Sequence, residues 1–137
     1  MNPPDVINWE EAMQQCGDDE EFLRELLEDL RSETDTQLAN IAGIIQNPQQ
    51  NPFQLIMRAA HVIKGAAANL MCGQLRAASM QLEQSAAQAH EAGETVASPD
   101  RQHAVQAGYA ALSRQHTTMV FFLNQLMWAK KTIFCYG

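Results

Sequence analysis

The chain has 137 residues and a net charge of −7, which argues against nucleic-acid binding and against an anionic membrane surface, because both require a basic face. It contains no run of 18 apolar residues, so no membrane span is expected. The length predicts one domain over residues 1–137, and the abundance of Ala, Gln, Leu, Glu and Met without sustained apolar–polar alternation predicts an all-α fold.

The cysteines and the N-terminal segment indicate a compartment. Cys16, Cys72 and Cys135 are odd in number and form no CxxC pair, so no disulfide framework is expected. The first residues carry acidic side chains and no basic region followed by an apolar run, so no signal peptide is predicted. The expected location is therefore reducing and soluble: the cytoplasm, and in a eukaryote also the nucleus.

The first two predicted helices cover residues 9–15 and about 20–46. Asn8 is suited to cap the first, and Asp18 or Asp19 the second. Apolar residues of the second recur at three- and four-residue intervals, which predicts one buried stripe. That stripe consists of Phe22, Leu23, Leu26, Leu27, Leu30, Leu38, Ile41, Ile44 and Ile45.

A turn over residues 47–52 precedes the central helix, predicted from about Pro52 to Met71 with the proline in its first turn. Its inward stripe is expected to be Phe53, Ile56, Met57, Ala60, Ile63, Ala67 and Leu70. At about 100° per residue, His61 lies roughly 120° from the centre of that stripe, so its ring should face solvent or a partner.

Two further helices are predicted over about 74–92 and 100–130, joined by a loop over 91–100. The core face of the first should be Leu75, Ala78, Leu82, Ala86 and Ala89. The core face of the second should be Ala104, Ala107, Ala111, Leu112, Met119, Phe122, Leu123 and Leu126. The apolar tail 133–137 is expected to fold back onto the bundle or to mark a contact surface. Together these elements predict an antiparallel up-down four-helix bundle, with a core over about 18–130 and a short extra N-terminal helix.

A second stripe on the central helix contains Arg58, His61, Gly65, Ala68 and Cys72. Its members after the histidine are small, so another protein could approach the backbone there. A glycine inside a helix costs about 1 kcal/mol relative to alanine. Clearance for a docking surface would be a reason to keep that glycine.

The run around His61 resembles the histidine-containing phosphotransfer (HPt) domain family. The resemblance rests on an exposed helix histidine, an apolar residue two positions later, then Lys-Gly and small residues. Here these are His61, Ile63, Lys64, Gly65, Ala66 and Ala67, followed by Asn69-Leu70 and, in the next helix, by Leu75 and Leu82-Glu83. Met71 stands where the family usually has glycine, so Gly73 is expected to make the turn instead.

The resemblance implies that His61 accepts a phosphoryl group from a receiver-domain aspartate of a hybrid histidine kinase and passes it to a response regulator. A neutral imidazole is nucleophilic near pH 7, and Lys64 would offset the phosphoryl charge. We expect Glu83 to accept a hydrogen bond from one ring nitrogen and so to fix the tautomer. Mg²⁺ is expected from the receiver, because this chain shows no convincing metal site of its own.

The partners would be receiver domains of such kinases and regulators, and the chain itself is expected to be a monomer. The residues expected to dock a receiver are Arg58, Val62, Ala68, Cys72, Arg76 and Met80. The other histidines, His90, His103 and His116, are expected in surface or capping roles. No glycine-rich loop or P-loop is present, so a phosphocarrier rather than a kinase is predicted.

Three alternatives stay open at this point. A pseudo-HPt adaptor would dock receivers without carrying phosphate. A metal- or ligand-binding bundle would be revealed by metal analysis. A helical-bundle scaffold would form a stable dimer through its C-terminal tail.

Overall fold

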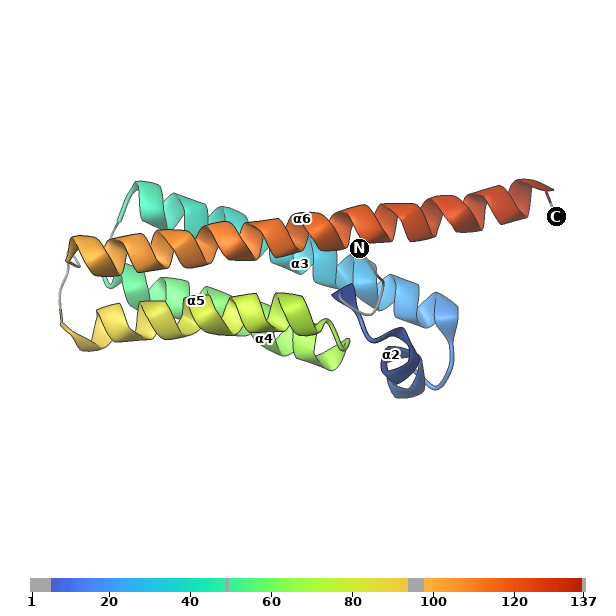
Figure 1. Ribbon diagram of the computed structural model, residues 1–137, viewed down its shortest axis with the longest axis horizontal. Coiled ribbons are helices and arrows are strands. Elements are labelled where there is room, and N and C mark those ends of the chain that lie inside the picture. The colour runs from blue at the N-terminus through green and yellow to red at the C-terminus, as the bar shows by residue number, and fades with distance from the viewer. Residues whose placement is uncertain (1–5, 49, 94–97, 137) are drawn as a thin grey trace.

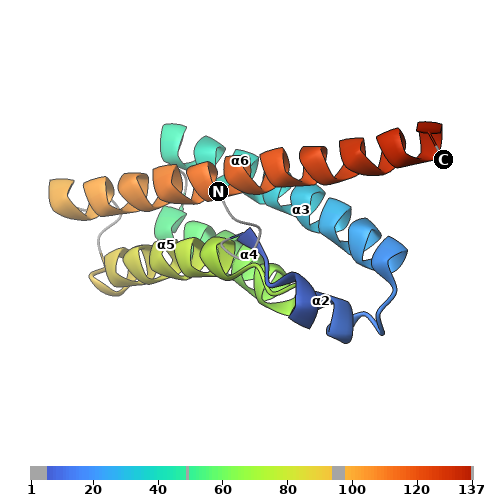
Figure 2. The ribbon, with the colours of Figure 1, turned by 45° about the vertical axis from the view of Figure 1, so that its right-hand side comes forward.

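The computed structural model describes residues 6–48, 50–93 and 98–136, with side chains up to residue 126. Regular structure in this part of the chain is entirely helical, as predicted (Figure 1). The helices are α2 (Trp9–Gln15), α3 (Glu20–Gln46), α4 (Pro52–Asn69), α5 (Gly73–Glu91) and α6 (Pro99–Tyr136). The last four form the bundle, and α2 lies at the end where α3 begins and α4 ends (Figures 1 and 2). Within the described residues, no helix has the length and apolar character of a membrane span.

The N-termini of α2 and α3 are capped by the side chains that the sequence predicts. Asn8 accepts a hydrogen bond from the Glu11 amide at 3.2 Å, and Asp19 accepts one from the Phe22 amide at 3.1 Å. Each cap satisfies an amide that has no carbonyl partner within its own helix. Acidic residues follow in both first turns, where the helix dipole favours them.

The reversal between α4 and α5 is made by Met71, which adopts φ +59°. The Cys72 amide bonds the Ala67 carbonyl at 2.9 Å, and the Met71 amide bonds the Ala68 carbonyl at 3.2 Å. These two bonds define a Schellman motif, in which a left-handed residue ends the helix. The expectation that Gly73 makes the turn is wrong, because Gly73 is already the first residue of α5. The Met71 carbonyl also accepts a bond from the Asn8 amide at 2.9 Å, which joins the turn to the segment before α2.

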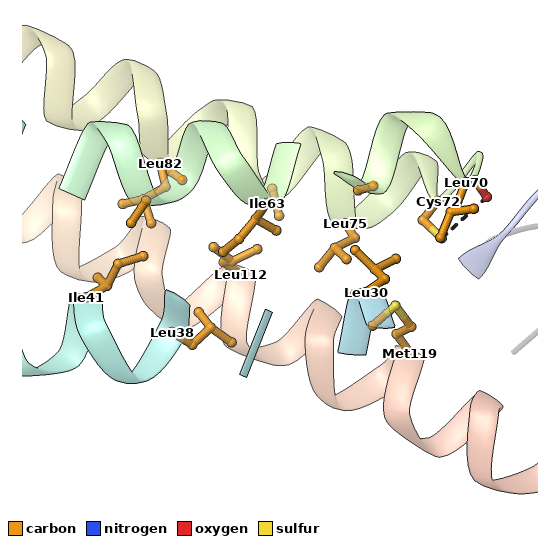
Figure 3. Close-up of a cluster of buried hydrophobic side chains, with 14 of the residues drawn as sticks. Leu30, Leu38, Ile41, Ile63, Leu70, Cys72, Leu75, Leu82, Leu112 and Met119 are labelled. Carbon is orange, nitrogen blue, oxygen red and sulfur yellow. Dashed lines mark hydrogen bonds between the residues drawn. The ribbon is translucent and has the colours of Figure 1, made fainter. Parts of the chain in front are cut away.

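The core contains apolar side chains from all four bundle helices (Figure 3). In the close-up, Ile41 of α3 faces Leu82 of α5, Ile63 of α4 lies beside Leu112 of α6, and Leu30 of α3 lies near Leu75 of α5 and Met119 of α6. The inward stripes predicted for α4 and α5 are confirmed, with only Met57 among them half-buried. Phe22 is a correction: it is 46% exposed, because it lies in the first turn of α3 beside the buried Leu23.

The phase of α6 differs from the prediction in its first half. Ala104 and Ala107 are exposed, whereas Val105 and Gly108 are buried. The neighbouring positions differ by about 100° around the helix, so a stripe drawn through the alanines faces away from the core. Gly108 accounts for the observed phase, because it lets the backbone of α6 approach Leu82 of α5.

The C-terminal part of α6 also differs from the prediction. Residues 133–136 continue the helix instead of folding back, and position 137 lies outside the described residues. Both ribbon views show this end of α6 beyond the turn that joins α4 to α5 (Figures 1 and 2). The backbone beyond residue 126 therefore extends the bundle axis.

His116 of α6 is buried, so the surface role expected for it is wrong. Its Nε2 lies 2.5 Å from Oδ1 of Asp35 on α3. The carboxylate is itself largely exposed, which places this polar contact at the edge of the core. His103 is exposed and His90 lies in the last turn of α5, as predicted.

We predict that Gly108→Ala is at least about 1 kcal/mol less stable than Gly43→Ala in urea unfolding. Both changes replace a glycine inside a helix by alanine. That replacement by itself stabilises a folded helix by about 0.5–1 kcal/mol. At Gly43 a new Cβ meets no atom within 4 Å, whereas at Gly108 it lies 3.3 Å from the Leu82 Cα. Equal stability of the two variants would show that the close packing of α5 against α6 does not require glycine at position 108.

Candidate functional site

His61 lies midway along α4 on the exposed side of the helix, as its helical phase predicts. Its side chain is 65% exposed, while Ile63 two positions later is fully buried. The buried stripe of α4 fixes the rotation of the helix and therefore fixes the outward direction of the histidine. The ring is thus within reach of a second molecule while its backbone is held by the bundle.

Glu83 of α5 contacts His61 across the α4–α5 hairpin. Its Oε1 lies 3.0 Å from Nδ1 of the ring, so the predicted contact between the two side chains is present. An ionised carboxylate can only accept hydrogen bonds, so this pairing favours a proton on Nδ1. In the neutral ring Nε2 is then unprotonated, with its lone pair available for reaction.

Lys64 contacts the other oxygen of the same carboxylate, which the sequence did not predict. Its Nζ lies 2.7 Å from Oε2 of Glu83. Lys64 and His61 are three residues apart, so both project toward α5 from adjacent turns of one helix. The carboxylate therefore joins the ring and the ammonium group in one cluster.

The cluster lowers the pKa of the Glu83 carboxyl below its usual value of 4.5. Partial burial by itself would raise that pKa, but hydrogen bonds and charge attraction from Lys64 and His61 outweigh the burial. The carboxylate is therefore ionised at neutral pH. Its oxygens contact Nδ1 of the ring and the ammonium group of Lys64, so it favours the neutral tautomer with the proton on Nδ1.

Gly65 lies one turn after His61 on the exposed face, and a Cβ built on it meets no atom within 4 Å. Nothing inside the described protein therefore requires a glycine at this position. The helix bears the cost of that glycine without a gain in internal packing. The open space beside Gly65 fits the expected clearance for another molecule.

The residues expected to dock a partner are mostly at the surface. Arg58 and Arg76 are exposed, Val62 and Met80 are exposed apolar side chains on α4 and α5, and Ala68 is half-buried. Cys72 is a correction. It is only 1% exposed, its thiol contacts the Leu70 carbonyl, and burial raises its pKa to about 12. The prediction of an exposed Cys72 extends the outer stripe of α4 by one more turn. The helix ends at Asn69, so Cys72 does not follow that stripe.

An open groove of about 470 Å³ between α3 and α4 was not expected from the sequence. Phe22 and Leu26 line it from α3, and Ala66 and Asn69 line it from α4. Phe22, which the apolar stripe of α3 predicts to be in the core, lines this groove instead. Its position in the first turn of α3 is the signal that could have placed it at the surface.

Among the described residues, no group of three His, Cys, Asp or Glu side chains is arranged to hold a metal ion. The polar cluster contains one carboxylate, one imidazole and one ammonium group, and the ammonium group is not a metal ligand. What the cluster offers is a nucleophilic nitrogen beside a positive charge, at an accessible surface. That combination suits the transfer of an anionic group to the ring.

Comparison with known proteins identifies the family. The sequence matches the family model of the Hpt domain over residues 25–115, about two-thirds of the chain, and this match includes His61 and the residues around it. The chain therefore belongs to the Hpt domain family, whose members are phosphocarriers rather than kinases, and the match supports a phosphotransfer role in a phosphorelay.

A solved structure shares the fold. It is that of a rice protein provisionally named a histidine-containing phosphotransfer protein, with a TM-score of 0.56 and 19% sequence identity. The match covers 90% of this chain and 84% of the rice chain. A comparison with curated protein sequences found no match.

We predict that Glu83→Gln changes how stability depends on pH. Because the folded-state pKa of Glu83 is lowered, its carboxylate stabilises the fold above pH 4.5, and that stabilisation is lost as the pH falls through the folded-state pKa. The difference in unfolding free energy between wild type and variant should thus be largest near neutral pH and shrink in acid. Urea unfolding between pH 3 and pH 7 measures it, and a constant difference would contradict the prediction.

Proposed function

We propose that this protein carries a phosphoryl group on His61 between two receiver domains of a phosphorelay. The observation that carries the proposal is the exposed ring with its Nδ1 against Glu83, a pairing that leaves Nε2 of the neutral ring unprotonated. The family match supports the same role. The donor would be the receiver domain of a hybrid histidine kinase, and the acceptor would be a response regulator.

In the proposed step, the Nε2 lone pair attacks the phosphorus of an aspartyl phosphate on the receiver. The new bond joins Nε2 to phosphorus, and the bond from phosphorus to the aspartate oxygen breaks, which releases the carboxylate. Catalysis of such a transfer depends mainly on positioning and on stabilisation of the phosphoryl charge. Lys64, one turn after His61 on α4, would supply that charge when the phosphoryl group competes with Glu83 for its ammonium group.

The receiver supplies the remaining components in this proposal. Mg²⁺ would be bound by the acidic residues of the receiver, where the transferred phosphoryl oxygens also lie. Arg58 and Arg76 are exposed near the site and would face that acidic surface. Val62 and Met80 would add apolar contacts at the edge of the interface. The protein would act as a monomer in the cytoplasm.

We predict that His61→Gln abolishes labelling by a phosphorylated receiver domain and leaves the melting temperature nearly unchanged. The ring is exposed, so its loss removes little buried surface. Acid-labile label measured after incubation with the receiver, alongside circular dichroism, tests both parts. Full labelling of the variant would overturn the proposal, and docking without label on the wild-type protein would favour a pseudo-HPt adaptor.

We predict that Gly65→Gln weakens receiver docking at least about tenfold without loss of helicity, because the new side chain would enter the space left for the partner. Gly43→Gln is the matched control, since Gly43 is also an exposed helix glycine with no atom near its Cβ position. Titration of each variant with a receiver domain measures the affinity. Unchanged docking by the Gly65 variant would rule out the clearance role.

A further inference from the structure

The Glu83 carboxylate makes two contacts that bear on what happens after the phosphoryl group arrives. One oxygen is 3.0 Å from Nδ1 of His61, and the other is 2.7 Å from Nζ of Lys64. The first contact affects the proton on the ring, and the second affects the cation that would accompany the phosphoryl group. Both effects act on the phosphorylated form as well as on the free histidine.

We propose that Glu83 keeps the Nδ1 proton on the phosphorylated His61 ring and thereby keeps the phosphoryl group easy to pass on. The inference rests on the proposed function, and it concerns the lifetime of the phosphorylated state rather than its existence. Glu83 is a positioning residue in this account, because it touches the ring and not the phosphoryl group.

Charge balance in the transfer step supports the role. A neutral ring with a proton on Nδ1 attacks through Nε2, so the product ring carries both the proton and the phosphoryl group and is a cation. No proton has to leave, provided that Nδ1 retains its own. In the return step the Nε2–phosphorus bond breaks and the electron pair stays on Nε2, which regenerates the neutral ring. A cationic ring leaves more readily than a ring that has lost its proton, because the latter would depart as an anion.

Lys64 reinforces the effect. While its ammonium group is paired with Glu83, it is less available to stabilise a phosphoryl group bound to Nε2. The negative charge of Glu83 also repels that phosphoryl group. Retention of the ring proton, competition for Lys64 and charge repulsion therefore all shorten the lifetime of phosphorylated His61.

Other charges near the cluster do not reproduce this arrangement. Among the described residues, Glu83 and Lys64 are the charged groups whose contacts with the ring or with each other define the cluster. Arg58 is on α4 one turn before His61, and Arg76 is on α5 two turns before Glu83. Both are cations, so neither can hold a proton on Nδ1.

The experiment compares wild type, Glu83→Gln and Glu28→Gln after phosphorylation with phosphoramidate, which needs no receiver domain. Glu28→Gln makes the same charge change on α3, where Glu28 pairs with Arg31. Loss of phosphohistidine is followed by ³¹P NMR between pH 5 and pH 10, and circular dichroism confirms that each variant is folded. His61→Gln identifies the signal that belongs to His61.

Phosphohistidine should be lost quickly while the ring is protonated. This fast loss should continue to higher pH in wild type and Glu28→Gln than in Glu83→Gln. We expect the midpoint of the fall in loss rate to lie at lower pH in Glu83→Gln, because the adjacent carboxylate that favours the ring proton is absent. The lifetime at pH 8 should rise several-fold. Equal midpoints and lifetimes in all three proteins would overturn this inference alone. Failure of wild-type His61 to be phosphorylated would instead count against the proposed function.

Discussion

The packing of α4 against α5 is the constraint on which the site depends. Buried apolar residues on each helix fix its rotation, and that rotation brings the carboxylate of Glu83 to both His61 and Lys64. None of the three groups needs to be deeply buried for this, because the backbones that carry them are held by the core. The His61 ring can therefore be exposed and still be oriented by a contact with the neighbouring helix.

The sequence predicted the helices, their caps and the exposed histidine, because these follow from local periodicity and capping chemistry. Ala104 and Ala107 were placed inward wrongly, since alanine is compatible with either face and Gly108 sets the phase only once α5 is beside it. His116 was placed at the surface, because its partner Asp35 lies 81 residues earlier. The Lys64–Glu83 pair does not follow from the sequence for the same reason, because it depends on how α4 packs against α5.

The outer face of α4 contains exposed residues that lower the stability of the folded protein. Gly65 lowers helix stability and has no internal neighbour to justify it, while Val62 leaves apolar surface in water. The buried side of the same helix offsets these costs, since Ile56, Ala60 and Ile63 are almost completely enclosed. One face of the helix thus provides the stability that allows the other to be shaped for a partner.

The left-handed turn at Met71 has a consequence for the alignment of α4 and α5. Because His61 and Glu83 are 22 residues apart on either side of it, the number of residues in the turn sets the angular register of α5 relative to α4. A single inserted residue that became part of α5 would turn its core stripe about 100° away from its present direction. A change in the length of this connection would therefore separate Glu83 from His61 and Lys64 even if all three residues were retained.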